Sequence, residues 1–67
     1  MNLPLPAEVE AALNDPHYPR PWSVGPSQYG RWPLGIYSEV DGIKRFFFGS
    51  HNLVWLNDIV DEAHKRA

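Results

Sequence analysis

The sequence predicts an α+β domain with a short N-terminal helix, an antiparallel meander of two or three strands, and a C-terminal helix packed on one face. Three observations predict this fold class. Apolar residues recur at helical spacing near both ends of the chain, and two runs of strand-forming residues lie between them. Those two runs are separated by Asp41-Gly42, a dipeptide that favours a two-residue hairpin turn.

The first helix is expected over residues 6–14. Val9, Ala12 and Leu13 recur at the spacing of one helix face and form a short apolar stripe. Pro16 follows closely, and a proline disfavours helical backbone at the residue before it. A helix this short needs tertiary contacts to persist.

Residues 15–21 contain three prolines and are expected to form an extended connector near polyproline II. The chain is therefore predicted to divide into two parts. Residues 1–21 form a short helix and a proline-rich connector, and residues 22–67 form a compact strand–hairpin–helix domain.

A candidate first strand covers residues 22–24, and the predicted hairpin covers residues 34–40 and 43–48. A two-residue turn sets the pairing as Val40–Ile43, Glu39–Lys44, Ser38–Arg45, Tyr37–Phe46 and Ile36–Phe47. The opposite charges of Glu39 and Lys44 favour this register. The alternative is a longer loop with Gly42 in the left-handed region, which would shift the pairing.

The two faces of this hairpin differ. Side chains alternate along a strand, so the three consecutive phenylalanines cannot all face one core. One face carries Ile36, Val40, Ile43 and Phe47, and the C-terminal helix is expected to cover it. The other carries Tyr37, Phe46 and Phe48. The N-terminal helix with its connector, Trp32 or a binding partner must cover that second face.

The C-terminal helix is predicted to begin at an N-cap formed by Ser50 or Asn52. A broad apolar face follows, made of Leu53, Leu56, Ile59, Val60 and Ala63. The spacing also predicts two i, i+4 ion pairs on its exposed side, Asp61–Lys65 and Glu62–Arg66.

The chain has 67 residues, no cysteine and nine aromatic residues. Domains below roughly 70–80 residues usually need an additional source of stability, which here is aromatic packing, a bound partner or self-association. The formal net charge of −2 argues against a general nucleic-acid binder. Without an apolar run of about 18 residues or a signal-like N-terminus, the default expectation is a cytoplasmic protein.

No catalytic, cofactor or metal site is expected. His17, His51 and His64 form no i, i+4 pair, and no cysteine is present to assist them. Ser50 and His51 are adjacent in sequence, but a nucleophile and its base also need an orienting group and an oxyanion site. The protein is therefore predicted not to be an enzyme.

The aromatic and basic residues predict a binding surface instead. Its expected contact residues are Arg31, Trp32, Tyr37, Arg45, Phe46 and Phe48, because aromatic and arginine side chains are enriched at interaction hot spots. The acidic balance favours a protein partner. A weak single-stranded nucleic-acid binder and a structural component of a homo-oligomer are the alternatives. The simpler interpretation is that the charged side chains are solvated and that the aromatic rings belong to an ordinary core.

Pro21-Trp22-Ser23-Val24, the strand leading to Asp41-Gly42, the returning strand and the final apolar helix together resemble a recurrent type. Short uncharacterised bacteriophage and prophage accessory proteins share this Pro-Trp-x-Val, strand, Asp-Gly hairpin, helix pattern. The resemblance covers residues 21–63. It implies a small accessory protein of a mobile element, a context in which such proteins often inhibit a host or defence protein. It implies no catalytic or binding residue.

Overall fold

The computed structural model describes residues 4–27 and 30–66 of the chain. The elements follow in the order α1 (Ala7–Leu13), β1 (Trp22–Pro26), β2 (Leu34–Val40), β3 (Ile43–Ser50) and α2 (Leu53–Lys65). The strands form one antiparallel sheet in the order β1-β2-β3. The predicted α+β fold is confirmed, with three strands in the meander.

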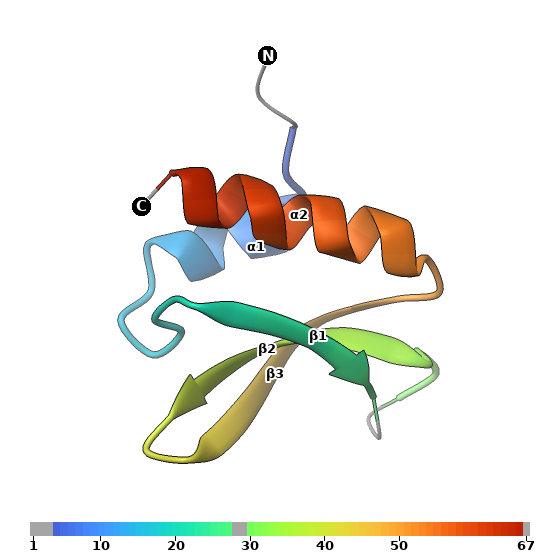
Figure 1. Ribbon diagram of the computed structural model, residues 1–67, viewed down its shortest axis with the longest axis horizontal. Helices are drawn as coiled ribbons and strands as arrows, with labels where there is room; N and C mark the ends of the chain where they lie inside the picture. The colour runs from blue at the N-terminus through green and yellow to red at the C-terminus, as the bar shows by residue number, and fades with distance from the viewer. Residues whose placement is uncertain (1–3, 28–29, 67) are drawn as a thin grey trace.

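The molecule has two layers, because both helices lie on the same face of the sheet (Figure 1). α2 packs on β1 and β2, and α1 packs on β3. We call the opposite side of the sheet the outer face. Neither helix of the described residues has the length and apolar character needed to cross a bilayer.

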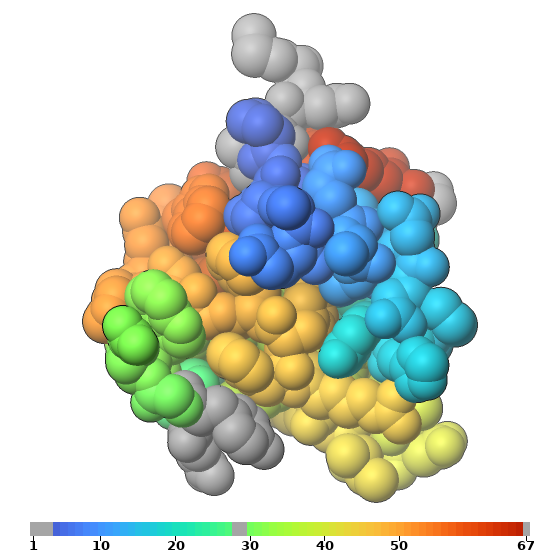
Figure 2. Space-filling model, turned by 180° about the vertical axis from the view of Figure 1, so that it is seen from behind, coloured from blue at the N-terminus to red at the C-terminus, as the bar shows by residue number. Residues whose placement is uncertain are grey.

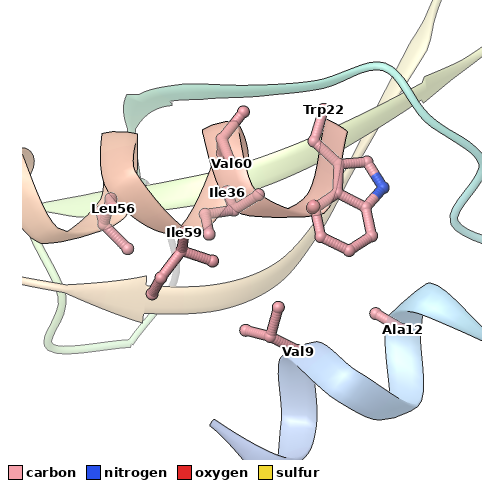
Figure 3. Close-up of a cluster of buried hydrophobic side chains, with 8 residues drawn as sticks. Val9, Ala12, Trp22, Ile36, Leu56, Ile59 and Val60 are labelled. Atoms are coloured by element: carbon pink, nitrogen blue, oxygen red, sulfur yellow. The ribbon is translucent and has the colours of Figure 1, made fainter. Parts of the chain in front are cut away.

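The hydrophobic core lies between the helices and the sheet (Figure 3). Its largest side chain is that of Trp22, which is 3% exposed. The indole Nε1 of Trp22 donates a hydrogen bond to the Tyr18 carbonyl oxygen at 2.9 Å, and its backbone N–H donates to His64 Nε2 at 2.9 Å. Both helices and the sheet contribute to this one core, whose buried members are Val9, Ala12, Trp22, Ile36, Leu56, Ile59, Val60 and Ala63.

The two helices are also tied together at their polar edges. Arg66 Nε donates to Glu62 Oε2 at 3.2 Å, which confirms the predicted i, i+4 pair. Arg66 Nη1 also donates to Glu10 Oε1 of α1 at 3.1 Å. These contacts raise the pKa of the Arg66 guanidinium. The Asp61–Lys65 pair is not formed among the described residues, as is common for exposed, flexible charges.

The connector is not extended, so that prediction is wrong. The backbone N–H of Tyr18 donates to the Asp15 carbonyl oxygen at 3.1 Å and closes a turn. The backbone N–H of His17 donates to Asp15 Oδ1 at 2.9 Å, which holds the pKa of the Asp15 carboxyl below its usual value. The turn delivers the Pro19 carbonyl to Ser38 Oγ at 2.6 Å. Tertiary hydrogen bonds thus override the polyproline preference of the segment.

The predicted hairpin register is confirmed from Val40–Ile43 to Tyr37–Phe46, and then it changes. Ile36 lies opposite Phe48, so its predicted pairing with Phe47 is wrong. A β-bulge accounts for the difference, because it places two residues of one strand against one of its partner. Phe47 is the additional residue.

The bulge explains how three consecutive phenylalanines are accommodated. The Phe47 ring lies 4.6 Å from the Trp22 ring, centroid to centroid, and the Phe48 ring lies 5.6 Å from that of Trp55. Both rings therefore face the core side, where they pack against the buried cluster. Phe46 is left on the outer face. The expectation that Phe48 shares a face with Phe46 is wrong for this reason.

The helices do not reach the turn of the hairpin. Ile43 is 63% exposed and Val40 is only half-buried, whereas Ile36 on the same strand is fully buried. The expected helix-covered face is therefore covered only at its Ile36 and Phe47 end.

Asn52 caps α2, since its side chain Oδ1 accepts from the Trp55 backbone N–H at 3.0 Å. Replacing Asn52 with alanine is expected to lower the free energy of unfolding by about 1 kcal/mol, because one helix N–H loses its partner. Urea denaturation followed by circular dichroism measures the change. Asn57→Ala, in the exposed middle of the same helix, is the matched control. Equal stability of the two variants would contradict the capping role.

Candidate interaction surface

Three aromatic side chains gather on the outer face. β2 supplies Tyr37, β3 supplies Phe46, and the segment before β2 supplies Trp32. The Tyr37 and Phe46 rings meet edge to face, with centroids 5.8 Å apart and an interplanar angle of 65°. The Tyr37 hydroxyl donates to the Pro26 carbonyl oxygen at 2.7 Å, which fixes the ring over β1.

The floor beneath these rings is a row of glycines. Gly25 pairs with Gly35, and Gly35 pairs with Gly49, so the three lie side by side across the sheet. A Cβ on Gly35 would overlap the Phe46 ring. A Cβ on Gly49 would lie 2.6 Å from Cγ and Cδ1 of Trp32. Because this row has no side chains, the Phe46 and Trp32 rings can approach the backbone closely.

Trp32 extends the surface towards α2. Its ring meets the His51 ring at 5.1 Å and 65°, just before the helix begins. In Figure 2 the segment after residue 30 (green) lies close to the start of α2 (orange). Tyr37, Phe46, Trp32 and His51 therefore follow one another along the outer face, and we call these four residues the aromatic strip. Trp32, at 40% exposed, is its most open ring among the large hydrophobic side chains.

Charged residues stand at both ends of the aromatic strip. Arg31 is exposed beside Trp32 at one end. Glu39 and Lys44 pair across β2 and β3 at the other, next to Asp41 in the turn, and all three are exposed. Arg31, Glu39 and Lys44 form no ion pair within the described part of the chain, so their charges face solvent.

The predicted contact residues divide between the two faces. Trp32, Tyr37 and Phe46 come together on the outer face, with Arg31 beside them. Arg45 lies opposite Ser38, on the core side, and its Nη1 donates to the His17 carbonyl oxygen at 3.1 Å.

Phe48, the sixth predicted contact residue, packs against Trp55 on the core side, as described above. Sequence reasoning missed His51 and the glycine row. The only sequence signal for the glycine row is the spacing of Gly35 and Gly49 from the turn at residues 41–42. That spacing predicts their pairing only when the bulge is taken into account.

The edges of the sheet are protected. β1 is short, ends at Pro26, and has the N–H of Trp22 occupied by His64. β3 carries Lys44 and Arg45 and contains the bulge. Bulges, prolines and lysines on edge strands hinder pairing with another chain. The outer face is therefore better suited to association than either edge.

Gly49→Ala tests how Trp32 is seated. The added methyl group meets the base of the indole, so the ring must leave the glycine row, and we expect a loss of about 1–3 kcal/mol with red-shifted tryptophan emission. Fluorescence during urea denaturation reports both quantities. Gly25→Ala is the matched control in the same row, because its Cβ meets nothing closer than 3.9 Å. Unchanged emission from Gly49→Ala would contradict this seating of Trp32.

Within the described residues, no group of three or more histidine, aspartate or glutamate side chains is arranged to hold a metal ion. The outer face offers aromatic side chains for contact, with charged residues at its two ends. No protein-family model, curated protein or solved structure matches this chain. The resemblance to bacteriophage accessory proteins stays a prediction.

Proposed function

We propose that this protein is a protein-binding module and that the outer face of its sheet is the contact surface. The observation that carries the proposal is the aromatic strip on a sheet face that neither helix covers. Rings held against a glycine floor lose little side-chain entropy when a partner covers them. Aromatic and arginine side chains are also the types enriched at hot spots, and Trp32 lies beside Arg31.

The mode of action we propose is occlusion, in which the module covers a functional surface of its partner. A flat aromatic face suits this role, since it excludes water over the contact without needing a deep pocket. In the context implied by the resemblance to phage accessory proteins, the partner is a host or defence protein.

Single-stranded nucleic acid is the second candidate, because stacked rings and nearby cations bind bases and phosphates. The charges favour it less. Arg45 is directed towards the connector through its bond to His17, and Lys44 stands across from Glu39. Phosphate contacts give binding a steep dependence on salt, whereas an aromatic protein interface gives little, so a salt titration separates the two candidates.

The test is an affinity pull-down from a nuclease-treated lysate of the organism that encodes the protein. Three baits are compared, namely the unchanged chain, Trp32→Ser on the aromatic strip, and Val54→Ser. Val54 is 70% exposed on α2 and serves as the matched control. We expect a stoichiometric protein that the first and third baits retain and Trp32→Ser loses. Equal capture by all three baits would refute the outer face as the contact surface.

A further inference from the structure

The two ends of the outer face differ in charge. The turn end carries two acidic residues and one basic residue, Glu39, Asp41 and Lys44, and therefore has a net charge of −1. The other end carries Arg31, with a charge of +1. Glu39 lies about 17 Å along β2 from Leu34, the residue that follows the segment carrying Arg31. The two ends are thus far enough apart to act as separate contact points.

Because its two ends carry opposite charges, the outer face is complementary to that of a second copy rotated by 180°. In a twofold dimer each residue of one copy meets a defined residue of the other, and the relation is reciprocal. A twofold axis parallel to the sheet, passing above Phe46 at right angles to the strands, would lay the Arg31 end of each copy over the Glu39 end of its partner. The two aromatic strips would then lie against each other in the middle.

We propose that, when no other protein covers the outer face, a second copy of this chain does, docked sheet to sheet in this antiparallel arrangement. The inference rests on the proposed function, because it concerns the same surface. The product has four layers, with two sheets inside and two pairs of helices outside. Face-to-face sheets pack about 10 Å apart with their side chains interdigitated.

The size of the face sets the strength of this dimer. Seven residues of β2 and three strands give a flat area of about 23 Å by 14 Å, or roughly 330 Å² for each copy. A stable interface buries about 800 Å² on each partner. The dimer is therefore weak and depends on protein concentration. Self-association is also one of the usual ways in which a domain of 67 residues gains stability.

Charge reversal tests the arrangement. Sedimentation of the unchanged chain from about 1 to about 500 µM, the range in which small interfaces dissociate, should show a mass that rises from one chain to two. Arg31→Glu and Glu39→Arg should each raise the Kd about 100-fold, since each places two pairs of like charges together. An equimolar mixture of these two variants should form the dimer again, because every contact in the mixed pair is then opposite in charge. Circular dichroism confirms that each variant is folded.

A chain that stays monomeric at the highest concentration overturns this proposal. So does a dimer whose Kd is unchanged by either reversal, or a mixture that fails to associate. The proposed function is judged separately by the Trp32→Ser pull-down. If the chain is monomeric but Trp32→Ser still loses a captured protein, the outer face is correct and only its partner is different.

Discussion

Replacing Trp22 with alanine is expected to lower the free energy of unfolding by about 3–5 kcal/mol and to unfold most of the protein. The indole is 3% exposed and lies 4.6 Å from the Phe47 ring. Its removal also leaves the Tyr18 carbonyl oxygen without the indole N–H. Since a single core of this size supplies only about 3–5 kcal/mol in total, the loss is comparable to the whole stability.

Urea denaturation followed by far-ultraviolet circular dichroism measures this effect. Trp22→Phe is the informative control, because it keeps an aromatic ring in the core and removes the hydrogen bond to Tyr18. We expect that variant to lose about 1–2 kcal/mol and to remain folded. A folded Trp22→Ala variant with less than about 1 kcal/mol of loss would contradict the packing of Trp22 in the core.

The adjacent phenylalanines Phe46 and Phe47 are expected to differ sharply in their contribution to stability. Phe47→Ala should cost about 2–4 kcal/mol, because the ring packs against both Trp22 and Tyr18 in the core. Phe46→Ala should cost about 1 kcal/mol, since the half-buried ring lies on the outer face, where it meets Tyr37 edge to face and packs over Gly35. In a binding assay we expect the opposite order, with the larger loss of affinity for Phe46→Ala.

The urea midpoints of these variants are compared with the condition that the dependence of the unfolding free energy on urea concentration is unchanged. Together with a third variant, they distinguish the bulged hairpin from a regular one. In a regular hairpin, side chains would alternate through Phe46, Phe47 and Phe48, and Phe48 would lie with Phe46 on the outer face. Phe48→Ala is therefore the third member of the series. A stability loss close to that of Phe47→Ala supports the bulge, and one close to that of Phe46→Ala contradicts it.

The parts of the fold that could be predicted are those set by local chemistry. Asp41 and Gly42 have φ of 53° and 79°, and the strong preference of this dipeptide for such a turn explains why the hairpin was predictable. Val9 and Ala12 are buried on the predicted face of α1, as are Leu56 and Ile59 on α2. Apolar spacing alone was sufficient for the helices.

The parts that could not be predicted depend on contacts between distant residues. The bulge brings Phe47 to Trp22 and Tyr18, and nothing in the local sequence around Phe47 indicates that contact. The connector turns because Ser38 and Trp22 bind its carbonyl groups from 19 and 4 residues away. Prolines indicate a stiff segment, but they do not indicate which carbonyl groups the core will use.

The candidate site was predictable to the same extent. Tyr37 and Phe46 pair directly in the confirmed part of the register, so their common face followed from the turn. Phe48 lies beyond the bulge and was therefore placed on the wrong face. Arg45 occupies the core side for a different reason, since its partner Ser38 is fully buried and bound to Pro19. Alternation along β3 places Arg45 on the face opposite to Phe46, whatever its charge.

The confinement of both helices to one layer has a practical consequence (Figure 1). The first residue of α1, Ala7, and the last residue of α2, Lys65, both belong to the layer behind the sheet. A fluorophore, a biosensor anchor or a fused enzyme joined beyond either helix would therefore be carried on the back of the molecule. Such attachments leave the aromatic side open to solution, so the protein can be tethered without blocking the surface under test.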